Sequence, residues 1–592
     1  MRKNNLFKPV ISAPARGRQG LITLESNLIQ MKKIKKYRTL LLMLTGLLLS
    51  SCEKFLEENN QSSLTEDPFY NTEAGITSAV NACYSGLRLW YGKEHGMGLS
   101  ETGTDLFLRG GDNKANQISD YTVDLNGGQT NIKDMWDMYY RALNVCNTAL
   151  ARLPQSPLTE TLKQQYLGEV HFLRAFYLFQ IVQIWGGVVL NTSPTEGVVT
   201  TAKRSTEEDF YEVINSDLNT AIKNLKEGKS TNGRITQDVA KGLLARVCLT
   251  QGSQYQNQAK YLEAATLAKE LINSGRYALF EDYKSLWDMG NAEGGSNSEV
   301  VFYVNYTNDD LLNGDFEAVA GKGNNSHLHF IMVYDRQEGL ERSIAYGRPF
   351  QRFMPSLHLL QLFDPVNDQR YDGSFQTVWF ANKAGMQKGD SQVFPEMAFG
   401  DTAVLTRRDP VTIEQANWAK SRYRIYDRNN LYRADGTPAL RSQFIQLSKF
   451  MDPTRLTVAQ EWSARDVFVI RLAELYLIAA EASLQSNPTE ALNLINTLRH
   501  TRAKVGKEQA MEVKAADLDI DFILEERARE LAGEQIRWFD LKRTHKLIPY
   551  VQQFNPDAKN NIKEYHQVRP IPQSQLDAIL NKEEFKQNPG YN

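Results

Sequence analysis

The sequence lacks an excess of charge of either sign. Its 68 Lys and Arg residues nearly balance its 70 Asp and Glu residues, which gives a formal net charge of -2, and the two signs are mixed along the chain. Such a surface has no field that would steer the protein onto nucleic acid or anionic lipid. We therefore predict that nucleic acid is not a partner.

Long apolar runs are missing from most of the chain. After residue 52 no segment is apolar for eighteen residues, the length that a membrane-spanning helix needs. The remaining part is long enough for a large core with several subregions. We predict that this part folds as a body that faces water.

The sequence signatures of common catalytic sites are absent. It contains no G-x-S-x-G, no H-E-x-x-H and no P-loop. Glycoside hydrolysis needs two placed carboxylates, and Asp364, Asp368 and Asp372 lie close together in sequence. The first and last of these precede Pro and Gly, which is typical of turns. We therefore predict that the protein is not an enzyme.

Clusters of metal ligands are also scarce. His327 and His329 would share one face of a strand, but no third ligand accompanies them. A polar loop could hold Ca²⁺ although the EF-hand spacing is absent, and its ligands would be Asn308, Asp309, Asp310 and Asp315. We predict neither a metal nor a cofactor.

A short apolar leader stands before the first cysteine. Residues 31–51 begin with a Lys-rich stretch, continue with an apolar run of roughly ten residues, and end in Leu49-Ser50-Ser51 before Cys52. This order is similar to the lipobox of bacterial lipoproteins, in which the cysteine becomes the acylated first residue. The alternative is a plain secretory signal with an incidental cysteine. Residues 1–30 show no helix or strand pattern, so we interpret them as an upstream start-site artefact.

Three further cysteines remain once Cys52 is assigned to the lipid. An odd number cannot form a complete disulfide framework. Cys83, Cys146 and Cys248 each lie in an apolar helical pattern. We predict that they are buried, inert thiols.

The rest of the chain divides into a tether and three regions. Residues 52–67 are polar and lack apolar periodicity, so we predict a lipidated flexible tether. Region 68–285 has helical periodicity, and its predicted helices span 75–89, 133–153, 162–185, 206–225, 236–249 and 260–273. Region 462–592 has it too, and its predicted helices span 466–485, 489–503 and 518–547.

Helix 162–185 is apolar nearly all round, so it should be packed on several sides by other helices. Helices of about fifteen residues in antiparallel pairs suggest a solenoid of tetratricopeptide type. Region 286–461 differs, because Gly, Asn, Asp and aromatic residues are scattered along it; only 300–306 and 375–380 are typical of strands. A loop-rich insert of this length is normally functional, so we expect the ligand there.

The helical regions carry an ordered set of short motifs. The main ones are Leu173-Arg174-Ala175-Phe176-Tyr177, Trp185-Gly186, Gly233-Arg234, Ile470-Arg471-Leu472-Ala473-Glu474, Glu526-Arg527, Glu530-Leu531, Arg537-Trp538-Phe539-Asp540-Leu541 and Gln587-Asn588-Pro589-Gly590-Tyr591. In this order they resemble the SusD/RagB group of outer-membrane nutrient-uptake lipoproteins, and the resemblance covers nearly all of the chain after Cys52. Arg471 with Glu474, and Arg537 with Asp540, are spaced to form ion pairs within one helix.

The resemblance implies a mainly α fold of tetratricopeptide-like helical pairs, with loops and short strands as the ligand face. It also implies a lipoprotein on the cell surface above a SusC-like TonB-dependent transporter. Such proteins bind oligosaccharide, or sometimes peptide, and deliver it to the channel. Two alternatives therefore stay open: a peptide-binding member of the same uptake system, and a tetratricopeptide scaffold that only joins proteins.

Sugar binding requires flat aromatic faces together with polar groups that reach hydroxyls. Residues of these types also stand outside the regular helix faces. These candidate ligand-binding residues are Trp90, Tyr91, Tyr334, Asp335, Arg336, Tyr346, Phe350 and Trp379.

We expect Cys52 to carry fatty acyl chains and the protein to fractionate with the outer membrane. Several acyl chains hold a protein firmly, whereas one holds it only marginally. Metabolic labelling with a fatty-acid analogue should mark the wild-type protein, and Cys52→Ala should lose both the label and the membrane association. Cys83→Ala is the control and should keep both. A labelled Cys52→Ala protein would contradict the anchor.

Overall fold

The computed structural model describes residues 69–112, 116–309, 311–313, 323–383, 397–420 and 422–591. The predicted leader, Cys52 and the tether lie outside these residues, as do Asp310 and Asp315 of the predicted calcium loop. Residues from Tyr70 onward belong to one compact unit. None of the helices among the described residues is long and apolar enough to cross a membrane.

Helices of the N-terminal region begin at side chains that cap them. Thr72, Thr159 and Thr236 each accept a hydrogen bond from a backbone N–H of the first turn, and Thr206 forms a capping box with Asp209. The helices that follow are α3 (Glu73–Ser85), α4 (Glu94–Ser100), α5 (Asn116–Asp120), α6 (Thr130–Arg152), α7 (Glu160–Trp185), α8 (Glu207–Asn224), α9 (Gln237–Tyr255) and α10 (Gln258–Ile272).

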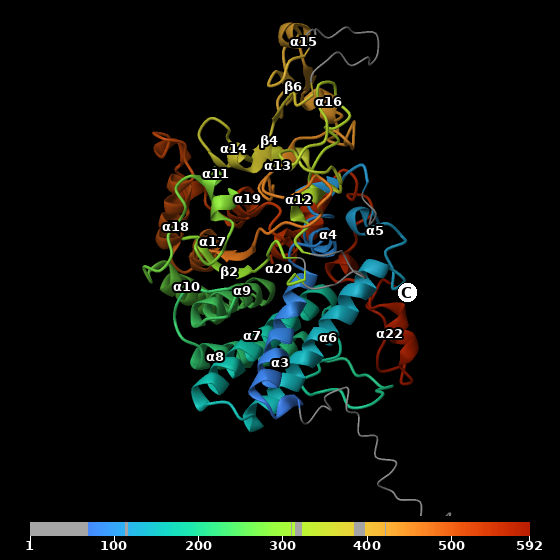
Figure 1. The fold of residues 1–592 in the computed structure, drawn as a ribbon, viewed down its shortest axis with the longest axis vertical. Helices are drawn as coiled ribbons and strands as arrows, with labels where there is room; N and C mark the ends of the chain where they lie inside the picture. Colours follow the sequence, from blue (N-terminus) through green and yellow to red (C-terminus); the bar gives the residue numbers. More distant parts are fainter. Residues whose placement is uncertain are drawn as a thin grey trace, which may run out of the picture. The chain divides into compact units, whose positions relative to one another are not determined.

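Helix α7 is the centre of this region. It packs against α3, α6, α8 and α9, and its second half from Tyr166 to Trp185 is buried at almost every position. The prediction that this helix is covered on several sides is therefore confirmed. Figure 1 shows α3, α6, α7 and α8 side by side in the lower half of the view.

The C-terminal region continues the same helical packing. Its helices are α17 (Leu472–Ser483), α18 (Pro488–Thr501), α19 (Ile520–Leu531), α20 (Arg537–Arg543), α21 (Leu547–Phe554) and α22 (Gln573–Ala578). Helix α17 packs on α10 as well as on α18, so the main hydrophobic core draws side chains from both ends of the chain. The mainly α fold with paired helices is confirmed. The boundaries near residues 285 and 461 stay a proposal.

Two helices predicted in this region, 466–485 and 518–547, are shorter in the structure. Residues 467–471 form strand β9 (Val467–Arg471), which pairs with β2 (Val300–Val304), because four successive apolar residues, Val467 to Ile470, suit a buried strand. The predicted helix 518–547 is broken between α19 and α20, where Gly533 and Gln535 adopt positive φ. Backbone amides of this turn, at Gly533 and Ile536, donate to the buried carboxylate of Glu101.

The region between the helical blocks holds short helices and strands. Predicted strand 300–306 corresponds to β2, and predicted strand 375–380 is divided into β4 (Phe375–Gln376) and β5 (Val378–Phe380). The other strands of this region are β3 (Phe353–Pro355), β6 (Thr402–Thr406), β7 (Arg424–Tyr426) and β8 (Gln446–Leu447), while β1 (Phe107–Arg109) belongs to the N-terminal region and pairs with β3. The short helices are α11 (Tyr283–Leu286), α12 (Ser326–His329), α13 (Leu357–Leu362), α14 (Arg370–Ser374), α15 (Ile413–Ala419) and α16 (Arg428–Leu431).

Strands β5, β6 and β7 form a three-stranded sheet in that order. β5 runs antiparallel to β6, and β6 runs parallel to β7. A second hydrophobic core lies beneath this sheet and contains Trp379, Val404 and Phe375 among others.

The three cysteines predicted to be buried, inert thiols are Cys83, Cys146 and Cys248. All three are buried and free of disulfides, which confirms that part of the prediction, while their inertness stays a prediction.

A cluster of buried ions connects these regions. We call Glu299, Arg370, Arg471, Arg502 and Glu530 the buried ion cluster; all five side chains are almost completely inaccessible to solvent. Glu530 lies 2.9 Å from Arg471, 3.0 Å from Arg502 and 3.2 Å from Arg370. Glu299 lies 2.5 Å from Arg471 and 2.9 Å from Arg502.

The two ion pairs predicted within single helices are wrong, because these side chains pair with other residues. Arg471 pairs with Glu299 and Glu530 of the buried ion cluster, while Glu474 pairs with Arg246 at 2.6 Å. Arg537 pairs with Asp105 at 2.6 Å, and Asp540 pairs with Arg527 and Arg543. Arg471 and Arg537 project toward other elements, so the carboxylates that pair with them come from residues distant in sequence.

We expect Glu530→Gln to destabilise the fold strongly. Burial alone would raise the pKa of Glu530, but the guanidiniums of Arg502, Arg471 and Arg370 hold it below its usual value. Removing the charge leaves these arginines short of a buried partner, which costs about 3–5 kcal/mol of unfolding free energy. Urea denaturation measures the change. Lys586→Met removes an exposed ion pair and should leave the midpoint unchanged; equal midpoints for both variants would contradict the role of the cluster.

We expect the stability of the fold to depend on pH through the buried carboxyl group of Glu101. Burial raises the pKa of Glu101 from 4.5 to about 7, although the amides of Ile536 and Gly533 oppose this rise. The folded state therefore binds this proton more tightly than the unfolded state. Stability from this group is present below about pH 4.5 and is lost as pH rises through 7, by up to about 3 kcal/mol.

In Glu101→Gln the proton no longer titrates. The free energy of unfolding, measured by urea denaturation at several pH values between 4.5 and 7.5, should fall less with pH in the variant than in the wild type. Parallel curves would contradict the raised pKa.

Candidate functional site

Four of the predicted ligand-binding rings are buried in the hydrophobic cores. Trp90 and Trp379 are each 0% exposed, and Tyr91 and Tyr334 are also buried. Trp90 packs against Tyr139 and Phe539 in the main core. In this structure these rings have no free face for a sugar, so their role as ligand contacts is not supported by their position.

The other predicted residues lie nearer the surface. Asp335 is half-buried and pairs with Arg342 at 2.7 Å, Arg336 is exposed, and Tyr346 and Phe350 are half-buried. Phe350 is covered by the guanidiniums of Arg348 and Arg352. Direct contact of these residues with a ligand stays a prediction.

Tyr334 has a positioning role for Tyr346. Burial raises the pKa of Tyr334 to about 12, so its hydroxyl stays protonated and donates to the carbonyl of Gly347 at 2.5 Å. The two rings meet edge to face with centroids 5.4 Å apart. Tyr346 in turn accepts a hydrogen bond from the backbone N–H of Phe380, at 2.8 Å.

Exposed aromatic rings gather at one end of the β5–β6–β7 sheet. Because β5 is antiparallel to β6 and β6 is parallel to β7, the last residue of β5 and the starts of β6 and β7 share one end. Phe380 ends β5 and pairs with Thr402. We call the residues that this topology brings there the sheet-end aromatic cluster: Tyr346, Phe380, Phe399, Trp418 and Tyr423.

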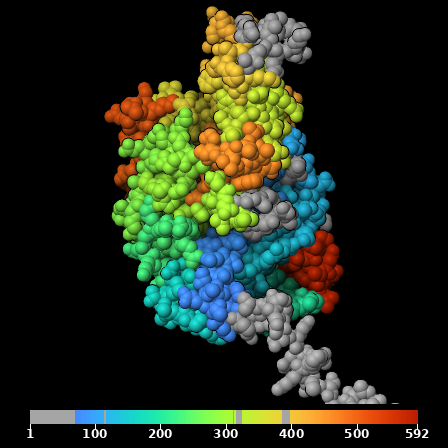
Figure 2. All heavy atoms as spheres, viewed as in Figure 1, coloured from blue at the N-terminus to red at the C-terminus, as the bar shows by residue number. Residues whose placement is uncertain are grey.

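These rings are accessible. Phe380 is 49% exposed, Phe399 is 70% exposed and Trp418 is 53% exposed. Figure 1 shows α15 and β6 at the upper end of the view, and in Figure 2 the yellow and orange atoms of this segment stand at the upper end of the face shown. Large apolar rings exposed together on a soluble protein are typical of a binding surface.

Polar groups surround the cluster. The guanidinium of Arg422 lies 4.3 Å from the ring centroid of Trp418, and Tyr423 meets the same ring edge to face. Asn382 exchanges two hydrogen bonds of 2.8 Å with the backbone of Glu341, which holds the turn at 335–342 against the end of β5. Asp335 and Arg336 belong to that turn, so the structure brings them close to the cluster.

Sequence reasoning missed Phe380, Phe399, Trp418 and Tyr423. One signal was available, since Trp379 and Phe380 are neighbours in a strand and must point to opposite faces. The sequence alone does not say which face is buried, and in the structure Trp379 faces the core while Phe380 faces outward. The spacing of Trp418 and Arg422, four residues apart around the end of a helix, was a second signal.

The histidines and carboxylates that lie close together in sequence are dispersed or buried in the structure. The prediction that His327 and His329 share a strand face is wrong, since both lie in α12 and are buried. Burial lowers the pKa of His329 to about 4, so it is neutral at pH 7. Within the described ranges there is no group of three or more His, Cys, Asp or Glu that could hold a metal ion. Asp364 and Asp372 are exposed, whereas Asp368 pairs with the buried Arg370.

Comparisons with known proteins agree with this architecture. A family model described as "SusD family" matches residues 299–591, and one described as "Starch-binding associating with outer membrane" matches residues 54–249. Among relatives, a SusD-like protein of Formosa agariphila is 25% identical over 90% of this chain and 96% of its own length. A SusD-like protein of Bacteroides ovatus is 22% identical over 88% of this chain and 84% of its own length.

Solved structures share the fold. A laminarin binding SusD-like protein superimposes with a TM-score of 0.66 at 22% identity, covering 88% of this chain and 100% of that chain. Surface glycan-binding protein A from Bacteroides thetaiotaomicron gives a TM-score of 0.64 at 20% identity, with the same coverage.

Proposed function

The chain belongs to the SusD family, and on that basis we propose that it binds glycan at the outer membrane and hands it to a SusC-like TonB-dependent transporter. The ligand in this proposal is an oligosaccharide that leaves the protein chemically unchanged. Two relatives in fold are named for laminarin and for surface glycan binding, which supports this class of ligand.

The observation that carries the proposal is the sheet-end aromatic cluster. Sugar rings present C–H faces that pack on aromatic rings, and their hydroxyls need hydrogen-bonding groups at the edge. Phe380, Phe399 and Trp418 offer exposed rings, and Asp335 and Arg336 lie on the neighbouring turn. A shallow, open surface of this kind suits a polysaccharide chain better than a small molecule that must be enclosed.

Location and partner rest on different observations. The Leu49-Ser50-Ser51-Cys52 motif supports a lipid anchor, and the description of the N-terminal family match supports association with the outer membrane. The transporter partner follows from the family.

Absence of catalysis is also part of the proposal. Near the sheet-end aromatic cluster, Asp335 pairs with Arg342 and Glu338 pairs with Arg424, and carboxylates held in such ion pairs suit a structural role rather than acid–base chemistry.

We expect Phe380→Ala and Trp418→Ala each to weaken glycan binding by roughly tenfold, which corresponds to about 1.4 kcal/mol for a lost stacking ring. Both rings are exposed, so melting temperatures should stay unchanged. Purified protein is first screened against laminarin, starch, polygalacturonate and a peptide digest, and the best ligand is then titrated by calorimetry.

Val505→Ala is the matched control, because Val505 is an exposed apolar residue outside the cluster, and it should leave the affinity unchanged. Full affinity in both ring variants would refute this site. Binding of the peptide digest alone would replace glycan with peptide, and shortening of a glycan by the purified protein would refute the absence of catalysis.

A further inference from the structure

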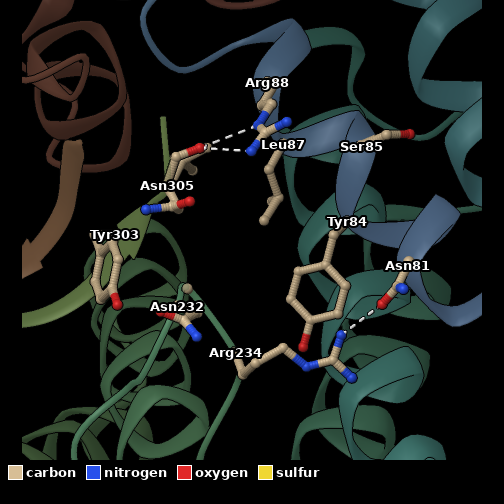
Figure 3. A pocket seen from close by; sticks show the side chains of 11 residues that line it. Asn81, Tyr84, Ser85, Leu87, Arg88, Asn232, Arg234, Tyr303 and Asn305 are labelled. Carbon is tan, nitrogen blue, oxygen red and sulfur yellow. Dashed lines mark hydrogen bonds between the residues drawn. The ribbon is translucent and has the colours of Figure 1, made fainter. Parts of the chain in front are cut away.

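A concave site lies in the N-terminal helical region, in a different place from the open sheet-end aromatic cluster. It is a pocket of about 230 Å³ between the end of α3, the turn at 232–234 and strand β2. Figure 3 shows Arg88 at one end of this pocket and Arg234 with Asn232 at the other, with Tyr84, Tyr303 and Asn305 between them. We call it the two-arginine pocket.

Arg88 brings a positive charge without a carboxylate partner. Its Nε and Nη2 donate to the carbonyl of Asn305 at 3.1 and 2.8 Å, and its Nη1 donates to the carbonyl of Leu312 at 2.6 Å. No ion pair joins Arg88 to an acidic side chain in the described part of the chain. A guanidinium has five N–H groups, so two remain for a ligand.

Arg234 is held differently. It pairs with the buried Glu169 at 2.6 Å, donates to Asn81 Oδ1 at 2.8 Å, and lies over the ring of Tyr84 with 4.8 Å between guanidinium carbon and ring centroid. Its charge is therefore balanced, and it fixes the shape of the pocket wall. The positive charge of Arg88 is not balanced in this way.

The remaining lining combines amide and hydroxyl groups with apolar surface, including Leu87 and Val304, and contains no Asp or Glu. Asn305 donates its amide N–H to Asp466, and Asn232 is exposed at the turn with a φ of +51°. Burial, and after it the charge of Arg88, lowers the pKa of nearby Lys93 to about 7, in keeping with a positive potential here. Arg88, the amides and the tyrosine rings together suit a polar ligand with one negative charge.

We propose that the two-arginine pocket binds a single acidic sugar unit, with the carboxylate of a uronic acid or a sulfate ester facing Arg88. Its volume is below the range of about 300–1,000 Å³ usual for drug-sized ligands, which suits one sugar unit rather than an extended chain. The choice of a sugar as the carrier of the anion rests on the proposed glycan-binding function. The anion preference itself rests only on the charges lining the pocket.

The test uses three probes on the purified full chain: methyl glucuronide, glucose 6-sulfate and methyl glucoside. We expect at least one of the two anionic probes to bind with a millimolar or tighter Kd and the neutral probe to bind at least tenfold more weakly. Binding should weaken in 0.5 M NaCl, because the Debye length then falls to a few ångströms. The two anionic probes distinguish carboxylate from sulfate.

Asn232→Asp is the decisive variant. Asp has the same shape as Asn and tolerates positive φ, so the fold should be kept, while its carboxylate repels an anion in the pocket. We expect at least a tenfold loss of affinity for the anionic probe. Asn493→Asp, an exposed change on α18, is the control and should bind like the wild type. Arg88→Gln should also lose at least tenfold, with its melting curve recorded to check folding.

Equal binding of neutral and anionic probes, no binding of either anionic probe, or full affinity in Asn232→Asp would overturn the proposal. Trp418→Ala tests whether the two sites are independent: it removes a ring of the sheet-end aromatic cluster and should leave binding of the anionic probes unchanged. If no polysaccharide binds but the anionic probe does, the proposed glycan function fails while the pocket stands. The opposite result rejects the pocket alone.

Discussion

The buried ion cluster is the constraint on which the rest of the structure depends. Glu530 of α19 holds Arg471 at the junction of β9 and α17, Arg502 after α18, and Arg370 at the start of α14. Glu299, just before β2, binds two of the same arginines. Buried charges are costly unless they are paired, so these five segments must assemble together or not at all. The cluster thereby fixes the strand pair β2–β9 and the turn that bears α14.

This arrangement explains how a loop-rich region can present a defined surface. Arg370 connects the segment that leads into β4 and β5 to the helical scaffold through Glu530 and Glu526. The β5–β6–β7 sheet then carries its aromatic rings at one end, while Trp379 and Val404 fill the core below. Rings that face outward are placed by residues that face inward, as the contact of Tyr334 with Tyr346 shows.

Local patterns predicted much of the scaffold. Apolar periodicity located the helices around α7, because this signal arises within a single helix, although α9 continues past the predicted end at residue 249 to Tyr255. The pairing of Arg471 with Glu299 and Glu530 could not be predicted from the sequence, because it depends on where distant segments meet in the fold. The same limit explains why Trp90 and Trp379 were predicted as ligand contacts although they are buried. An aromatic residue beside Gly or in a short strand has the same local sequence pattern whether it is buried or exposed.

The two candidate sites differ in what they can recognise. The sheet-end aromatic cluster is open, and its Phe399 and Trp418 side chains are more than half exposed. It can therefore bind along a glycan chain without selecting for charge. The two-arginine pocket is concave and positively charged, so it can distinguish an acidic unit from a neutral one. A protein with both features would take its affinity from stacking along the chain and its selectivity from one pendant anion.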